Sequence, residues 1–360
     1  MNKDRNSASH LRALAQLIFC PERSDEPLQH VATLDEKARA EFFHLADAHH
    51  VIVRGITPLQ QQALATNHAE LVLQTQGVLD QEHLRISKDL AYLDNVCTQI
   101  RAAGCEVTVI KTLDHWPDFG SDLDLFTAGD ESRLVELFKV DLRARHCFRT
   151  PGDCIAHKRS FALPGLPERV ELHINRLGPV GEHVELAKRF ISRSQTAAFG
   201  EYQFQIPAPE ERVIAGTLQR MYRNLYVRIC DVYNTSRLIE KGLLDFGALR
   251  EVSEMAGIWP GVATFLRLAV EYSNKYRGDN LELPAAVVDS AHFGADRTVV
   301  RGGYFRFPAL PCGLALYARQ LRQAANTGDL PAAARLSLVP PLASMGALAY
   351  AVTGNSGRVW

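Results

Sequence analysis

Two acidic residues stand inside an otherwise apolar run and constrain how this part of the chain folds. The run 120–126 reads GSDLDLF, in which Asp122 and Asp124 alternate with leucines as they would in a β-strand. Side chains two positions apart on a strand point to the same face, so both carboxylates project together while Leu123 and Leu125 are buried behind them. Like charges this close repel each other, and a divalent cation such as Mg²⁺ removes the repulsion. The run therefore predicts a metal site on a rigid strand, the alternative being an edge strand whose acidic residues face solvent.

The segments around this run predict a small sheet with helices packed on it. Apolar residues recur at a spacing of three and four over 86–100 and are followed by Gly104, which is the pattern of an amphipathic helix with a glycine after its last turn. Asp130 is expected to cap a second helix directly after the acidic strand. The predicted strands are 105–110, 121–127, 157–163 and 168–174, and a β-run at 202–206 is expected to close the sheet.

The whole chain is predicted to be an α+β protein with its chemistry in the middle. Its 360 residues suffice for two or three domains. We expect a helical N-terminal region (1–104), a small α/β core with a mixed sheet (105–207) and a helical C-terminal region (208–360). The C-terminal region is predicted to begin with one long amphipathic helix over 214–229, followed by helices over 245–256, 260–277, 312–326 and 331–350.

Charge and cysteine usage argue against several classes of function. The net charge is -1, so no global basic field recruits nucleic acid, and a nucleic-acid partner is not expected. The seven cysteines include no C-x-x-C pair, which argues against a thiolate zinc site. The first residues lack the apolar core of a signal peptide, and no apolar run reaches the roughly 20 residues that span a bilayer. We therefore expect a cytoplasmic protein without a membrane partner.

A third carboxylate is predicted on a later strand of the same sheet. Glu171 lies between Val170 and Leu172 in a strand-like run, so its side chain points away from theirs. Carboxylates on adjacent strands form a platform for two metal ions, which can clamp the attacking and leaving oxygens of a phosphoryl transfer. The third carboxylate can also accept the proton of an incoming hydroxyl. Glu185 is an alternative third carboxylate, and Glu171 could instead pair with Arg169 or Lys158.

The order of these elements resembles the polymerase-β-type nucleotidyltransferase superfamily, and within it a bacterial group described as nucleotidyltransferase family proteins. That group has a strand ending in Lys-Gly, then an Asp-x-Asp strand, an acidic-Leu-His strand, and a helix that carries an aspartate. The resemblance covers about residues 84–275. The matching segments, in the same order, are Val109-Ile110-Lys111-Thr112, Ser121-Asp122-Leu123-Asp124-Leu125, Val170-Glu171-Leu172-His173 and Cys230-Asp231-Val232.

The resemblance implies an enzyme. It would be a nucleotidyltransferase that uses Mg²⁺, with two ions expected, to move a nucleotidyl group from a nucleoside triphosphate (NTP) such as ATP to a hydroxyl-type acceptor. The acceptor would be a small molecule, a peptide or a protein, and a partner protein of a biosynthetic pathway is also implied. The C-terminal helices would form the acceptor side of the cleft. Asp122, Asp124 and Glu171 would be the catalytic and metal-holding residues, and Lys111, Thr112, Ser121, Lys158 and Arg159 would bind the nucleotide.

One departure from the family pattern keeps a second function open. Lys111-Thr112 stands where the superfamily has a glycine that lets the backbone approach the triphosphate, and threonine lacks that conformational freedom. The alternative is therefore a non-catalytic binding or accessory protein with a nucleotidyltransferase fold, and a metal-dependent hydrolase is a third possibility. His173 is expected to be a core or supporting histidine. Asp231 is expected either to act in the site or only to cap its helix or pair with Arg228 or Arg223.

Overall fold

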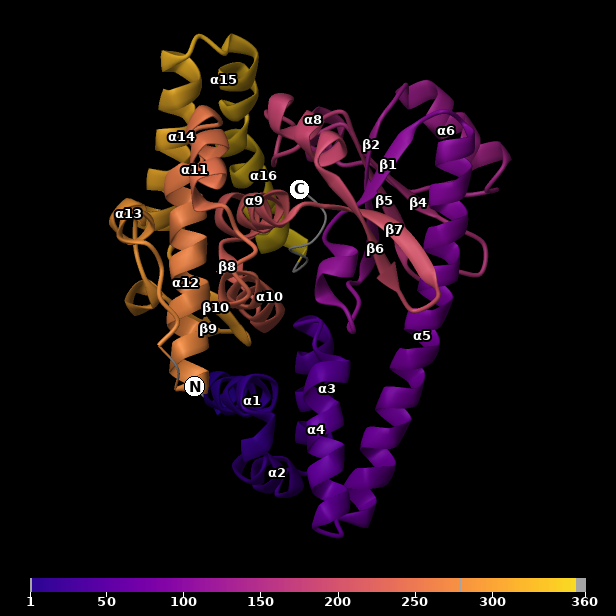
Figure 1. Cartoon of the computed structure of the whole chain (residues 1–360), viewed down its shortest axis with the longest axis vertical. Coiled ribbons are helices and arrows are strands. Elements are labelled where there is room, and N and C mark those ends of the chain that lie inside the picture. The colour runs from indigo at the N-terminus through magenta and orange to yellow at the C-terminus, as the bar shows by residue number, and fades with distance from the viewer. Residues whose placement is uncertain (1, 279, 354–360) are drawn as a thin grey trace.

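The protein has the mixed α+β architecture that the sequence predicts, with a small sheet between two helical regions. The computed structural model describes residues 2–278 and 280–353. Figure 1 shows the N-terminal helices at the bottom of the molecule, the sheet at the upper right and the C-terminal helices at the upper left. The long helix α5 (Ala69–Ala102) runs from the N-terminal region up to the sheet.

The central sheet has five strands in the order β1-β2-β5-β4-β3. The pair of β2 and β5 is parallel and the other neighbouring pairs are antiparallel, so the sheet is mixed, as predicted. All of the strands predicted between 105 and 174 are present, with slightly different ends, and one short strand is added. The strands are β1 (Glu106–Val109), β2 (Asp122–Ala128), β3 (Arg145–His146), β4 (Lys158–Ala162) and β5 (Arg169–Ile174).

Two helices bury the apolar face of this sheet. Leu123 and Leu125 of β2 and Phe161 of β4 pack in one core with residues of α5 and of α6 (Glu131–Val140). Phe161 also stacks on Phe138 of α6, with the ring centroids 4.2 Å apart. Because the leucines of β2 are fixed against these helices, its acidic residues must project from the opposite face.

Both covering helices end or begin where the sequence predicts. Gly104 follows α5 with a φ of 76°, and the amide of Cys105 donates a hydrogen bond to the carbonyl of Ile100, as in a glycine-terminated helix. Asp130 caps α6 by accepting a hydrogen bond from the amide of Arg133 at 2.8 Å. These local signals therefore determine the ends of the helices that support the site.

The opposite face of the sheet is only partly covered. Phe126 of β2 packs against Phe190 of α8 (Glu185–Ser192), with the ring centroids 6.0 Å apart. This contact belongs to a large apolar core that also includes residues of α9 (Pro209–Gln219) and of the N-terminal helices. The part of β2 that precedes Phe126 lies outside this core and faces a cavity.

The predicted strand at 202–206 does not close the sheet, which corrects that expectation. β7 (Tyr202–Pro207) pairs with β6 (Ser194–Phe199) in a separate two-stranded sheet. Gly200, with a φ of 60°, turns the chain back immediately after β6, so β7 pairs with the strand that precedes it. Phe204 of this hairpin still contributes to the core below the central sheet.

The N-terminal region is helical, as predicted. Its last helix, α5, has 34 residues and is therefore about 50 Å long at 1.5 Å per residue. Its first half packs with the N-terminal helices and its second half packs under the sheet. The preceding helices are α1 (Asn2–Phe19), α2 (Asp25–Ala32), α3 (Glu36–Ala48) and α4 (Ile52–Ala65).

The single helix predicted over 214–229 is broken in two, which corrects that prediction. After α9, a π-helical turn covers Arg220–Asn224, Leu225 adopts a φ of 56°, and the chain passes through β8 (Tyr226–Val227) before α10 begins. The apolar spacing continues across the break because both helices face the same core. Periodicity alone therefore cannot reveal the break.

The remaining C-terminal elements are mostly helical, with a small sheet in the order β8-β10-β9. Gly302 and Gly303 form the turn between β9 and β10. The helix predicted over 331–350 is divided into two helices. These elements are α10 (Ile229–Glu240), α11 (Phe246–Met255), α12 (Trp259–Arg277), α13 (Ala285–Ser290), β9 (Val299–Arg301), β10 (Tyr304–Arg306), α14 (Leu314–Asn326), α15 (Leu330–Leu336) and α16 (Val339–Thr353). No helix in the described part of the chain combines the length and the apolar character needed to cross a membrane.

Candidate active site

The three predicted carboxylates lie together on one face of the central sheet. In the parallel pair of β2 and β5, Asp124 is directly opposite Glu171, and Asp122 is opposite Arg169. On the other side of Glu171, its register partner on β4 is Ser160. Residues in register on adjacent strands share a face, so a polar strip crosses β2, β5 and β4. The structure thus brings Asp122, Asp124 and Glu171 together.

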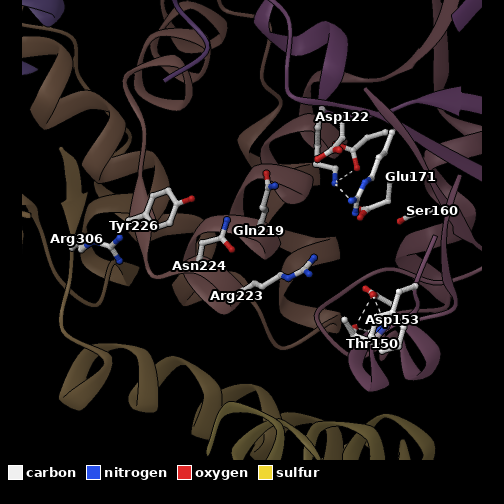
Figure 2. A pocket seen from close by; sticks show the side chains of 14 residues that line it. Asp122, Thr150, Asp153, Ser160, Glu171, Gln219, Arg223, Asn224, Tyr226 and Arg306 are labelled. Atoms are coloured by element: carbon white, nitrogen blue, oxygen red, sulfur yellow. Dashed lines mark hydrogen bonds and ion pairs between the residues drawn. The ribbon is translucent and has the colours of Figure 1, made fainter. Parts of the chain in front are cut away.

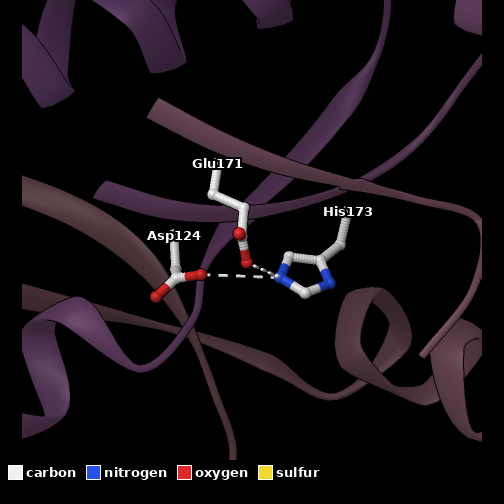
Figure 3. A group of neighbouring side chains, drawn as sticks. All are labelled: Asp124, Glu171 and His173. Carbon is white, nitrogen blue, oxygen red and sulfur yellow. Dashed lines mark ion pairs between the residues drawn. The ribbon is translucent and has the colours of Figure 1, made fainter. Parts of the chain in front are cut away.

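Asp124, Glu171 and His173 form a group that could hold a metal ion (Figure 3). One ligand atom of each residue lies within 4.8 Å of the other two. His173 Nε2 is 3.0 Å from Glu171 Oε1 and 3.4 Å from Asp124 Oδ1. Carboxylate oxygens suit Mg²⁺ and Mn²⁺, and an imidazole nitrogen suits transition metals such as Zn²⁺. The donor set therefore fits a divalent cation held by two carboxylates and one imidazole.

Two lysines lie next to these carboxylates. Lys111 Nζ is 2.6 Å from Asp124 Oδ1, and Lys158 Nζ is 2.5 Å from Glu171 Oε1. Burial alone would raise the pKa of Glu171, but Lys158, the hydrogen bond with His173 and the charge of Lys111 outweigh it and hold that pKa well below 4.5. Glu171 is therefore ionised at neutral pH and is a poor proton acceptor.

Asp122 differs from the other two carboxylates. Within the described residues, no lysine, arginine or histidine lies within ion-pair distance of it, whereas Asp124 pairs with Lys111 and Glu171 with Lys158. Burial, followed by the negative charges of Asp124 and Glu171, raises the pKa of Asp122 to about 6. A cation near Asp122 would stabilise its charged form.

An unusual backbone conformation directs Lys111 at the carboxylates. Lys111 has a φ of 61° and a ψ of -52°, and the amide of Thr112 donates a hydrogen bond to the carbonyl of Ile110 at 2.6 Å. This is a γ-turn with positive φ, which is rare and strained for a residue with a side chain, and such strain concentrates at functional sites. The Thr112 hydroxyl donates to the carbonyl of Asp122 and accepts from the amide of Asp124. Thr112 therefore fixes the start of β2 beside the turn, and its hydroxyl is already engaged.

The polar strip faces a cavity of about 690 Å³ (Figure 2). The sheet forms one wall, and the π-helical turn after α9 forms another wall with Arg223 and Asn224. Figure 2 shows these two wall residues in the middle of the view, with Asp122 and Glu171 on the right and Tyr226 on the left. A cavity of this size is in the range that holds a small-molecule or cofactor ligand.

Three arginines bring positive charge to this cavity. Arg169 lines it from β5, Arg223 from the π-helical turn and Arg306 from β10. In residues 2–278 and 280–353, no carboxylate lies within ion-pair distance of any of the three. The Arg306 guanidinium lies over the Tyr226 ring, 5.1 Å from its centroid. Guanidinium groups without carboxylate partners favour the binding of anions such as phosphates.

Two residues expected to bind the nucleotide lie outside this arrangement. Arg159 follows Lys158 on β4, so its side chain points to the other face, where its Nη2 is 2.6 Å from Glu131 Oε1. The sequence predicts that Arg159 binds the nucleotide together with Lys158, but the structure places its side chain on the face opposite Lys158, away from the carboxylates. Ser121 is exposed before β2 and does not line the cavity in the described part of the chain. Glu185, the alternative third carboxylate, pairs with a lysine on the exposed surface of α8.

A buried ion pair holds the turn that carries Arg223. Arg220 Nε is 2.7 Å from Asp231 Oδ2, and both side chains are almost fully buried. Asp231 Oδ2 also accepts a hydrogen bond from the amide of Arg228 at the start of α10. Asp231 therefore caps its helix, which is one of the roles expected from the sequence, but its ion-pair partner is Arg220 and not Arg223 or Arg228. The pair fixes the cavity wall.

A second pair of carboxyl groups lies at the edge of the sheet next to the site. Arg85 Nη1 is 3.3 Å from Asp89 Oδ2 and 3.6 Å from Glu168 Oε1, and it also donates to the carbonyl of Gly120 directly before β2. Asp89 Oδ1 and Glu168 Oε2 are buried without a hydrogen-bond donor. Burial, the charge of Glu168 and a hydrogen bond with Glu168 raise the pKa of Asp89 to about 8. Below about pH 8, Asp89 is therefore expected to hold a proton that it can donate to Glu168.

Asparagine at position 89 is expected to reduce the loss of stability between pH 5 and pH 8. The pKa of Asp89 is about 8 in the folded protein and 3.8 in the reference state, so between these pH values the folded state holds a proton that the unfolded chain has released. Stability from this group is therefore full below pH 3.8 and is lost as the pH rises through about 8. An amide stays neutral throughout. The Tm of each protein is measured at pH 5 and at pH 8. The decrease in Tm from pH 5 to pH 8 should be smaller in Asp89→Asn than in the wild type, by at least about 2 °C.

The exposed Asp80 of α5 supplies the control for this experiment. Asp80→Asn changes the net charge equally and should leave the pH dependence of the wild type unchanged. Equal falls in Tm for Asp89→Asn and the wild type would show that Asp89 is ionised in the folded protein.

The sequence pattern misses several residues of the cavity. Alternation along β5 was an available signal for Arg169 and His173, which share a face with Glu171. Arg223 and Tyr226 have no comparable signal, because they reach the cavity only through the break between α9 and α10.

Comparison of the chain with protein-family models, with curated proteins and with solved structures gave no match. The geometry and the charges of the cavity therefore carry the functional proposal by themselves.

Proposed function

We propose that the protein is a nucleotidyltransferase that depends on a divalent metal, with Mg²⁺ as the metal and an NTP as the donor. The acceptor would be a hydroxyl group on a small molecule, a peptide or a protein. One observation carries the proposal: Asp122, Asp124 and Glu171 lie on one side of a cavity and Arg223, which has no carboxylate partner among the described residues, lines another side. Carboxylates suit Mg²⁺ and guanidinium groups suit phosphates, so this combination suits a metal–NTP complex.

The proposed reaction is an attack on the α-phosphorus of the NTP. The hydroxyl oxygen of the acceptor forms the new bond, and the bond from the α-phosphorus to the oxygen bridging to the β-phosphate breaks. Pyrophosphate leaves with the electron pair of that bond, and the hydroxyl proton passes to water in the open cavity. A bound metal would offset the negative charge of the transferred group. Lys111 and Arg223 would position the phosphates.

Different side chains would bind the first and the second metal ion. Asp124, Glu171 and His173 supply one group of converging ligand atoms. The resemblance implies two ions, and Asp122, which has no ion-pair partner among the described residues, would be the added ligand for the second. Glu171 is proposed as a ligand and not as the proton acceptor, because its pKa lies well below 4.5.

A non-catalytic binding protein is the second candidate. The ion pairs of Lys111 with Asp124 and of Lys158 with Glu171 already neutralise the carboxylates, which favours a protein that binds a partner without turning over a nucleotide. The hydroxyl of Thr112 is hydrogen-bonded to the backbone of β2. Its side chain therefore prevents the close approach of a triphosphate to the backbone that a glycine at this position would allow.

Thermal unfolding with each of the four NTPs, with and without Mg²⁺, tests the proposal. A nucleotidyltransferase should show a rise in Tm that requires both the metal and an NTP. Arg223→Gln should weaken the rise, whereas Arg133→Gln, a matched change on the exposed surface of α6, should not. The absence of a rise with every NTP would contradict the proposal.

Products from an NTP labelled at the α-phosphorus then separate the three candidate functions. In the presence of a metabolite extract, a nucleotidyltransferase moves the label to an acceptor and releases pyrophosphate. A hydrolase yields a labelled free nucleotide. A binding protein returns the NTP intact, and that result together with a stable protein partner would favour the second candidate.

A further inference from the structure

Lys111 lies where three ligand atoms converge. Its Nζ is 2.6 Å from Asp124 Oδ1, 3.4 Å from His173 Nε2 and 3.8 Å from Glu171 Oε1. These residues are the group that could hold a metal ion, and Figure 3 shows the same three atoms pointing toward one another. The ammonium of Lys111 and a metal ion would therefore use the same ligands.

The ammonium and a divalent ion exclude each other at this position. Mg²⁺ binds oxygen at about 2.0–2.1 Å, so an ion on Asp124 Oδ1 would lie within about 5 Å of an ammonium bonded to the same oxygen. Two positive charges this close in a partly buried site repel each other strongly. The lone pairs that accept from Lys111 are also those that a metal would use. One of the two cations has to leave.

Of the two lysines beside the possible metal ligands, Lys111 is the one whose ammonium can move away from them. The side chain of Lys158 is 4% exposed and pairs with Glu171, whereas the side chain of Lys111 is 14% exposed and lines the large cavity. The flexible four-carbon stem of a lysine allows its ammonium to reorient without a change in the backbone. Arg223 lines the same cavity, so a polyphosphate bound there would offer the ammonium of Lys111 new partners.

We propose that Lys111 competes with a divalent cation for Asp124, Glu171 and His173, so that the cation binds tightly only when a polyphosphate draws the ammonium away. The inference rests on the metal site of the proposed function and extends it, because it assigns the coupling between metal and nucleotide to one side chain. Linkage is reciprocal, so the metal in turn strengthens nucleotide binding. Lys111 then has the carboxylates as partners in one state and phosphate oxygens in the other.

Direct measurement of Mn²⁺ binding without nucleotide tests the competition. The free Mn²⁺ signal in electron paramagnetic resonance gives the Kd for the wild type and for Lys111→Met. The substitution removes the competing charge, so the Kd should fall by about ten-fold. A non-hydrolysable NTP analogue should lower the Kd of the wild type and should have a much smaller effect on Lys111→Met. Lys111→Arg keeps the charge and should bind Mn²⁺ as weakly as the wild type.

The controls separate failure of this inference from failure of the proposed function. Lys139→Met removes an exposed lysine of α6 and should leave the Kd unchanged, and Asp124→Asn should abolish binding. If Mn²⁺ binds in an Asp124-dependent way but with equal Kd in the wild type and Lys111→Met, the competition is refuted and the metal site stands. If no variant binds Mn²⁺ with or without the analogue, both proposals fail.

A measurement on the wild type keeps the inference testable if Lys111→Met does not fold. Brief acetylation followed by mass spectrometry reports how accessible each lysine amine is. Mn²⁺ alone should increase the labelling of Lys111, because the displaced ammonium moves into the cavity, while the exposed Lys139 serves as the internal reference. Addition of the NTP analogue should reduce the labelling again. Unchanged labelling of Lys111 at saturating Mn²⁺ would refute the competition.

Discussion

Asparagine in place of Asp124 is expected to abolish divalent-cation binding and to lower nucleotide turnover by about 1,000-fold. Asp124 is the carboxylate that lies directly opposite Glu171 and belongs to the group of possible metal ligands with His173. An amide has nearly the same shape but no charge, so it leaves the strand intact and weakens the attraction for a cation. Mn²⁺ binding and the release of pyrophosphate from an NTP measure the two effects.

An equivalent change far from the cavity supplies the control. Asp289 is exposed on α13, and Asp289→Asn should keep the cation binding and turnover of the wild type. Asp122→Asn should also weaken cation binding, but by less, because Asp122 lies outside the group of three converging ligands. Undiminished turnover in Asp124→Asn, with unchanged Mn²⁺ affinity, would contradict a metal site on this strand.

Methionine in place of Arg220 is expected to lower the free energy of unfolding by about 3–5 kcal/mol, because it leaves the buried carboxylate of Asp231 without its charged partner. The two side chains are 2% and 7% exposed, with 2.7 Å between Arg220 Nε and Asp231 Oδ2. The same pair fixes the π-helical turn that carries Arg223. Urea denaturation should therefore show the loss of stability, and the Tm rise with Mg²⁺ and an NTP should weaken as well.

The double replacement Arg220→Met with Asp231→Leu distinguishes the cost of an unpaired charge from the cost of lost packing. When both charges are removed, much of the stability should return, since a buried ion pair can often be replaced by apolar side chains at little cost. A double variant as unstable as Arg220→Met would show that the shape of Arg220, and not the charge of Asp231, determines the effect.

The strands of the candidate site could be predicted because their signals are local. Alternation along 120–126 places Asp122 and Asp124 on one face, and the same rule places Glu171 on the face of its own strand. The order of the elements was enough to expect that the two strands belong to one sheet. Applied strictly, alternation would also have separated Arg159 from Lys158 and added His173 to the group.

The remaining part of the site depends on interactions that no local pattern contains. The break after α9 is stabilised by Arg220 and Asp231, which pair across the β8 segment, while the apolar spacing runs through the break without a change. The break nevertheless decides where Arg223 lies. The ion pairs of Lys111 and Lys158 likewise depend on the rotamers of side chains from one turn and three strands, which the sequence alone does not determine.

The parallel pairing of β2 with β5 has a consequence for any dissection of the molecule. Parallel neighbours need a long crossover, and here the chain from 129 to 168 lies between the two strands. Asp124 and Glu171 therefore come together only when the segment between their strands has folded. Arg223 lies still later in the sequence, beyond residue 207. A fragment limited to 105–207 would retain Asp124 and Glu171 but lose both Arg223 and the helix α5 that buries the apolar face of the sheet, so cation binding and nucleotide recognition have to be separated by substitutions in the full chain.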